Sequence, residues 1–201
     1  GSNYLNIQKV QDVYLAGILP TPGIAYLTAS TGANAGIVIS ASHNPFYDNG
    51  IKIFKGDGFK LSDEKEAEIE QLVLSENMDL STKSVQDTGR VYAMADSGKS
   101  YANFLKHTVP GKNYFKGLKI VMDCSNGATF DVAPELLTIL GADVDSLFIH
   151  PDGKNINDNC GSQNPEVLRK NVVNKEAETR WSMNCRFKAV FTPYADKKLG
   201  E

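Results

Sequence analysis

Hydrophobic and polar positions along the first 60 residues predict short strands separated by turns and one helix. Residues 13–19 form an apolar run that predicts a strand, and the prolines within residues 20–23 end it because proline cannot donate to a strand ladder. Residues 24–30 fit a short helix. The β-branched run at residues 36–39 is typical of a buried strand, and residues 51–54 alternate like a second one.

A charged helix and a polar segment come next. Ser62 is the expected N-cap of a helix whose first turn holds Asp63 and Glu64, which favour the positive end of the helix dipole. Its apolar stripe is formed by Ile69, Leu72 and Val73. Residues 75–90 are polar and predict a linker or an exposed hairpin.

The second half of the chain alternates between strands and helices. The pattern predicts a helix at 97–109, a strand at 118–122, a turn at 123–127, a helix at 132–140 and a strand at 144–149. This βαβ order favours α/β architecture with mixed, largely parallel sheets flanked by helices. Functional sites in such folds lie at the carboxyl ends of strands.

Composition and charge exclude several classes of protein. The 201 residues correspond to one or two domains, with 21 basic and 24 acidic side chains and a net charge of −3. This balance argues against a nucleic-acid partner and against a polybasic membrane anchor. No apolar run approaches the roughly 20 residues that a membrane-spanning helix needs. Three cysteines without metal-ligand spacing argue against a disulfide framework or zinc site and favour the cytoplasm.

The segment that offers most chemistry is residues 40–52, Ser-Ala-Ser-His-Asn-Pro-Phe-Tyr-Asp-Asn-Gly-Ile-Lys. It follows the predicted buried strand, so its side chains should lie at a sheet edge. Ser42 has a hydroxyl that can carry a phosphoryl group, and His43 and Asn44 can donate hydrogen bonds. Lys52 supplies a cation, or a base if its pKa is lowered.

The same residues have simpler interpretations. Residues 40–52 could be only a polar turn between two strands. Serine-hydrolase chemistry is disfavoured because no Gly-x-Ser-x-Gly sequence is present. The turn at 123–127 could border an active cleft, although a role in packing the domains together is favoured. Asn155, Asn157 and Asp158 are interpreted as a polar loop without a catalytic role.

The string SASHNPFYDNGIK resembles the active-serine loop of the α-D-phosphohexomutases, and of the bacterial phosphoglucosamine mutases in particular. Four other segments carry the same resemblance: LAGILPTPGIAYLT, GKSYANFLKHTVP, FKGLKIVMDCSNGAT and PDGKNINDNCGSQNPEVL. The resemblance implies a partial first domain over residues 1–88 and an incomplete second domain over residues 89–178. Residues 179–201 show no such likeness and are interpreted as a divergent tail.

The resemblance also implies an activity and roles for individual residues. Ser42 would become phosphoserine, and the family enzymes would interconvert glucosamine 6-phosphate and glucosamine 1-phosphate through a bound 1,6-bisphosphate. His43 and Asn44 would orient the phosphate. Lys52 would act either as general acid and base or as a charge partner of the phosphate. The turn at Asn49, counted with Asn44 among the phosphate-binding residues, would aim Lys52 toward Ser42.

The family resemblance further implies Mg²⁺, bound by the phosphate on Ser42 and by three aspartates of an Asp-Gly-Asp-x-Asp-Arg loop. That loop does not occur in this sequence. We therefore expect weak Mg²⁺ binding, little activity of the chain alone, and a homodimer that covers the incomplete first domain. Alternatives are a fragment of a phosphomannomutase or phosphoglucomutase, or a non-catalytic remnant that binds phosphosugars.

Overall fold

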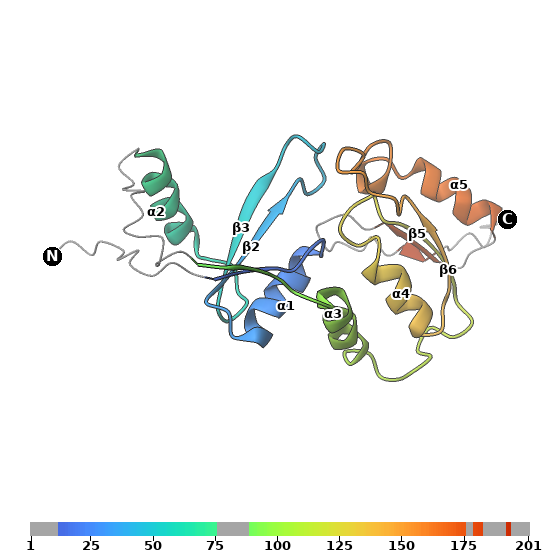
Figure 1. The fold of residues 1–201 in the computed structure, drawn as a ribbon. Coiled ribbons are helices and arrows are strands. Elements are labelled where there is room, and N and C mark those ends of the chain that lie inside the picture. Colours follow the sequence, from blue (N-terminus) through green and yellow to red (C-terminus); the bar gives the residue numbers. More distant parts are fainter. Residues whose placement is uncertain (1–11, 76–88, 176–178, 183–191, 194–201) are drawn as a thin grey trace.

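The computed structural model describes residues 12–75, 89–175, 179–182 and 192–193 (Figure 1). The elements follow one another as β1 (Val13–Leu15), α1 (Thr21–Thr31), β2 (Ala35–Ser40), β3 (Gly50–Lys55), α2 (Asp63–Leu74), β4 (Val91–Ala93), α3 (Ser97–Lys106), β5 (Lys119–Asp123), α4 (Val132–Ile139), β6 (Asp143–Leu147), a 3₁₀ turn (Gly161–Gln163), α5 (Glu166–Asn174), β7 (Thr179–Ser182) and β8 (Thr192–Pro193). Mixed α/β architecture with parallel sheets, expected from the sequence, is confirmed.

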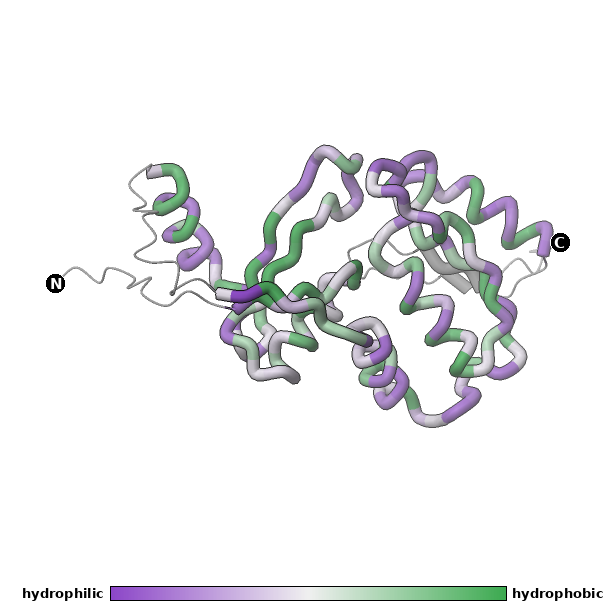
Figure 2. The backbone as a smooth tube through the Cα atoms, viewed as in Figure 1, coloured by the Kyte–Doolittle hydropathy of each residue, from purple (hydrophilic) through white to green (hydrophobic). Residues whose placement is uncertain are grey.

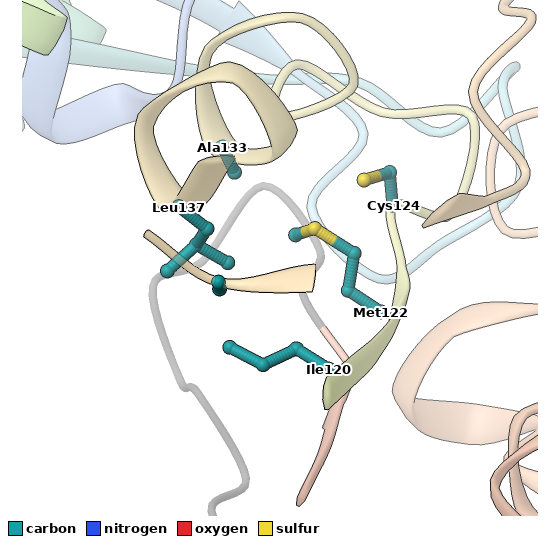
Figure 3. Close-up of a cluster of buried hydrophobic side chains, with 6 residues drawn as sticks. Ile120, Met122, Cys124, Ala133 and Leu137 are labelled. Atoms are coloured by element: carbon teal, nitrogen blue, oxygen red, sulfur yellow. The ribbon is translucent and has the colours of Figure 1, made fainter. Parts of the chain in front are cut away.

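The second half of the chain forms a sheet that is covered on both faces by helices. Its strands lie in the order β6-β5-β7-β8, and β5 is parallel to both β6 and β7. Ile120 and Met122 of β5 pack against Leu137 of α4 (Figure 3). Val121, which points to the opposite face, packs against Leu168 of α5. β5 is therefore the buried centre of three layers, as its continuous apolar run requires.

The hairpin of β2 and β3 is covered on one face only. The two strands are antiparallel, and α1 contacts them. Val38 and Ser40 are buried on the covered face, whereas Ile37 and Ile39 on the other face are 62% and 73% exposed. The interpretation of residues 36–39 as a buried strand is therefore wrong for one face, because among the described residues a helix covers only the other face. Figure 2 shows how hydrophobic this hairpin is.

Contacts between the two halves cross the domain boundary that the sequence suggested. β1 pairs in parallel with β4, so that Val13 lies beside Val91. Leu27 of α1, Tyr101 of α3 and Val132 of α4 share one buried cluster. At the other end of the chain, β7 pairs with β5, although it belongs to the segment interpreted as a divergent tail. The division at residues 88 and 178 stays a prediction.

Several element bounds differ from those expected. β1 ends at Leu15, and α1 begins at Thr21 because the first turn of a helix accepts a proline such as Pro22. α3 ends at Lys106, and α5 was not expected at all. The apolar stripe of α2 is not buried in the described residues. Most of the predicted linker, residues 76–88, lies outside the described residues. Among the described residues, no helix is long and apolar enough to cross a membrane.

Candidate functional site

Residues 40–49, here called the serine loop, run from the last residue of β2 to the start of β3 and place Ser42 in an unusual backbone conformation. Ser42 has a φ of 60°, in the left-handed region that residues other than glycine rarely adopt. Its N–H donates to Ser40 Oγ at 3.0 Å, and its side chain is only partly buried. Strained residues of this kind cluster at active sites, where the surrounding structure holds them.

Amide side chains within the serine loop are engaged in the loop itself. Asn44 Nδ2 donates to Asp48 Oδ2 at 2.6 Å, and Asn49 Nδ2 donates to the carbonyl of Phe46 at 2.9 Å. The Asn44 N–H also donates to the Ala41 carbonyl at 3.0 Å. The two asparagines predicted to bind phosphate therefore shape the loop, and their contact with a phosphate stays a prediction.

His43 lies beside the serine but is poorly placed to activate it. Its Nδ1 is 3.5 Å from Ser42 Oγ, at the outer limit of a hydrogen bond, and the side chain is exposed. A serine activated by histidine needs a shorter, buried contact and a third group that orients the imidazole. The geometry agrees with the argument against serine-hydrolase chemistry.

Lys52 lies in β3 directly opposite Val38 of β2. It is therefore on the same face of the hairpin as Val38 and Ser40. Its Nζ is buried and has no hydrogen-bond partner among the described residues. It lines a groove of about 940 Å³ between β3 and α2, together with Thr21. A buried ammonium without a partner is costly, so this position is suited to pair with an anionic group; Glu66 and Glu70 line the same groove. The predicted roles of Lys52 and Ser42 in one reaction stay predictions.

Sequence reasoning missed one residue of this region. Asn157, interpreted as part of a polar loop, donates from Nδ2 to the carbonyl of Ser42 at 3.1 Å and to the carbonyl of Asn44 at 2.8 Å. Figure 1 shows the tip of the β2–β3 hairpin turned toward the loop that precedes α5. The only signal in the sequence was the density of asparagines, which tolerate left-handed backbone better than most residues. Asn157 and Asn159 have φ values of 59° and 52°.

A buried carboxylate organises the loops behind Asn157. Asp123, at the carboxyl end of β5, is fully buried and accepts from the N–H of Ser125 at 2.8 Å and of Gly161 at 2.7 Å. Burial raises the pKa of this carboxyl, although these hydrogen bonds oppose the shift. The pKa of the neighbouring Cys124 thiol is raised by burial to about 12, so this thiol is unsuited to act as a nucleophile.

A hollow of about 320 Å³ lies between the serine loop and the second half of the chain. The serine-loop side is lined by Ser40 and Asn49, and the opposite side by Asn126, Gly127 and Ile156. The turn that follows β5 therefore borders the candidate site, the alternative that the sequence did not favour.

The described residues do not form a magnesium site. They contain no group of three or more His, Cys, Asp or Glu side chains that could hold a metal ion. Within the serine loop, the carboxylate of Asp48 already accepts a hydrogen bond from the side chain of Asn44. A hard divalent cation needs several oxygen ligands, so the described side chains by themselves do not fit Mg²⁺.

Comparisons with known proteins agree with this arrangement. Residues 7–79 match the family model of phosphoglucomutase/phosphomannomutase, alpha/beta/alpha domain I. The chain belongs to the phosphohexomutase family. A phosphoglucosamine mutase of Syntrophus aciditrophicus is 55% identical over 170 residues, 85% of this chain and 38% of that protein. A phosphoglucosamine mutase of Syntrophobacter fumaroxidans is 56% identical over 164 residues, 82% of this chain and 36% of that protein.

Solved structures show the same fold. A phosphoglucomutase/phosphomannomutase family protein of Burkholderia thailandensis superposes with a TM-score of 0.64 at 23% identity, over 86% of this chain and 38% of that one. A putative phosphomannomutase of Thermus thermophilus gives 0.65 at 20% identity, over 85% and 39%. The chain thus spans less than two fifths of the length of each of these four proteins.

Proposed function

We propose that this chain is the phosphoserine-bearing part of a phosphoglucosamine mutase, in which Ser42 carries the phosphoryl group. The observation that supports this most is the strained, partly exposed Ser42 at the end of β2, with a φ of 60°. Curated relatives that are 48–56% identical over most of this chain bear the same name, which favours this substrate over the mannose and glucose alternatives.

The proposed reaction consists of two phosphoryl transfers, one from Ser42 to the sugar phosphate and one from the bound bisphosphate back to Ser42. The hydroxyl oxygen of a glucosamine monophosphate attacks the phosphorus on Ser42, the bond from phosphorus to Ser42 Oγ breaks, and the hydroxyl proton is lost to a base. Ser42 Oγ leaves as the alkoxide equivalent and is protonated. The bound 1,6-bisphosphate then reorients and returns its other phosphoryl group to Ser42. Most of the catalysis is positioning and electrostatic stabilisation of the transferred group.

Other residues of the site take supporting roles in this proposal. Lys52 either moves the proton or pairs with the phosphate, and its buried Nζ without a partner among the described residues supports the second role at least as well as the first. His43, Asn44 and Asn49 would orient the phosphate once the loop has bound it. The binding of Mg²⁺ and a cytoplasmic location remain predictions. The absence of a nucleic-acid partner remains a prediction as well.

The test of this function is transfer of phosphate to one hydroxyl. The chain is incubated with glucose 1,6-bisphosphate or glucosamine 1,6-bisphosphate, with added Mg²⁺, and analysed by intact mass and phosphopeptide mapping. We expect one phosphate on Ser42, none in Ser42→Ala, and an unchanged yield in Ser30→Ala, which removes an exposed hydroxyl from α1. No modification, or a phosphate on another residue, would contradict the proposal.

A homodimer is part of the same proposal. The uncovered face of the β2–β3 hairpin exposes Ile37, Ile39 and Ile51 by 62%, 73% and 67%. Adjacent exposed isoleucines on a two-stranded hairpin favour association with a second copy. Size-exclusion chromatography with light scattering should show a dimer that Ile39→Lys converts to a monomer. A strictly monomeric chain at all concentrations would count against it.

A further inference from the structure

The side-chain amide of Asn157 joins two parts of the chain that are 115 residues apart in sequence. It contacts the carbonyl oxygens of Ser42 and Asn44, on either side of His43. Because both partners are acceptors, only the NH₂ group of the amide can face them. The peptide groups that follow Ser42 and Asn44 are therefore held from outside the serine loop.

Asn157 is itself held firmly. Its N–H donates to the carbonyl of Ser125 at 2.9 Å, and its backbone adopts the left-handed conformation that asparagine tolerates. Ser125 and Gly161, which lie close to Asn157, both donate their N–H groups to the buried carboxylate of Asp123. A continuous set of hydrogen bonds thus runs from the end of β5 to the serine loop.

We propose that Asn157 is a positioning residue, which keeps Ser42 in its strained conformation so that Oγ faces the phosphosugar. The inference rests on the proposed function of Ser42 as phosphoryl carrier. A left-handed serine costs free energy and persists only where neighbouring groups hold it. Within the loop, Ser40 Oγ accepts from the Ser42 N–H, and Asn157 holds the Ser42 carbonyl from the other side.

Asn157→Asp tests this role with the smallest change of shape. Aspartate also tolerates left-handed backbone, but it replaces the donor with an oxygen that repels both carbonyls. Asn159→Asp is the matched control. Asn159 has a φ of 52°, and its Nδ2 donates to the neighbouring Asp158, not to the serine loop.

Hydrogen exchange on the full chain gives the first readout. At neutral pH we expect Asn157→Asp to speed exchange of the amides in residues 40–49 by at least about tenfold, because two hydrogen bonds to the loop are lost. Peptides from β5 should keep their protection, and Asn159→Asp should leave the serine loop unchanged. Unchanged loop exchange in Asn157→Asp, or an equal effect in Asn159→Asp, would overturn the inference.

Hydrogen exchange measured in acid distinguishes the loss of a hydrogen bond from general structural damage. Below about pH 4 the carboxyl introduced by Asn157→Asp becomes protonated and regains one O–H donor. Loop protection, corrected for the intrinsic exchange rate, should then partly recover in this variant alone. Loss of protection that acid does not reverse would mean that the loop has lost its fold rather than a hydrogen bond, which contradicts the proposal.

The rate at which Ser42 accepts phosphate from glucose 1,6-bisphosphate connects the loop to the chemistry. Asn157→Asp should slow this transfer by at least about tenfold, since a misplaced nucleophile reacts slowly. A loosened loop with an unchanged transfer rate would overturn the positioning role. If the unsubstituted chain accepts no phosphate, the proposed function fails, and the exchange experiment still decides whether Asn157 holds the loop.

Discussion

The close approach of β2 to α1 at Gly36 should be sensitive to a single methyl group. A Cβ atom at Gly36 would lie 2.0 Å from Thr28 Oγ1. Favourable contacts of carbon are near 3.5 Å, so the two atoms would have to separate by about 1.5 Å. β2 leads directly into the serine loop, so this contact lies on the strand that precedes Ser42.

The cost of Gly36→Ala follows from what Thr28 can do. Thr28 is 4% exposed, and its Oγ1 donates to the Ile24 carbonyl at 2.7 Å. Turning the hydroxyl away breaks this buried hydrogen bond, at about 1–3 kcal/mol. Moving the strand instead costs about 1–3 kcal/mol as an overpacked core. Either response lowers the free energy of unfolding by about 1–3 kcal/mol.

A double-mutant cycle separates this clash from other effects of the added methyl. Thr28→Ala removes the clashing oxygen, so Gly36→Ala should cost less in that background, with a coupling energy of at least about 1 kcal/mol. Gly111→Ala is the control, since its Cβ would meet no atom within 4 Å. Urea unfolding followed by circular dichroism measures all four variants, and additive effects of Gly36→Ala and Thr28→Ala would refute the reasoning.

Three further predictions concern the second half of the chain. Burial raises the pKa of the Asp123 carboxyl, so the contribution of this group to stability is fully present below its unfolded pKa of about 3.9. That contribution declines as the pH rises through the folded pKa. In Asp123→Asn, the urea midpoint of unfolding should therefore fall less steeply with rising pH. Cys124 and Cys160, buried and with pKa values raised to about 12, should resist a thiol reagent at pH 8 until the chain is unfolded, and rapid labelling of either peptide in mass mapping would contradict this. Leu137→Ala should cost about 2–5 kcal/mol of unfolding free energy, whereas Ile139→Ala in the same helix, 45% exposed, should cost much less.

The candidate site was only partly predictable from sequence. The polar run after β2 identified Ser42 as the residue to examine, and the turn before β3 placed Lys52 on the neighbouring strand. The left-handed conformation of Ser42 and its contact with Asn157 could not be read in the same way. Both depend on how a loop from the second half of the chain packs against the first.

The secondary structure of neighbouring segments was determined by the sequence alone. The β5, α4 and β6 unit follows from apolar periodicity, a proline in the first helical turn and a glycine after the helix, all of which act between residues close in the chain. Tertiary structure decided which strands became neighbours, such as Val13 with Val91, and which face of β2 remained uncovered. Such contacts join residues far apart in sequence, and their free energy depends on the path of the whole chain, which local patterns do not specify.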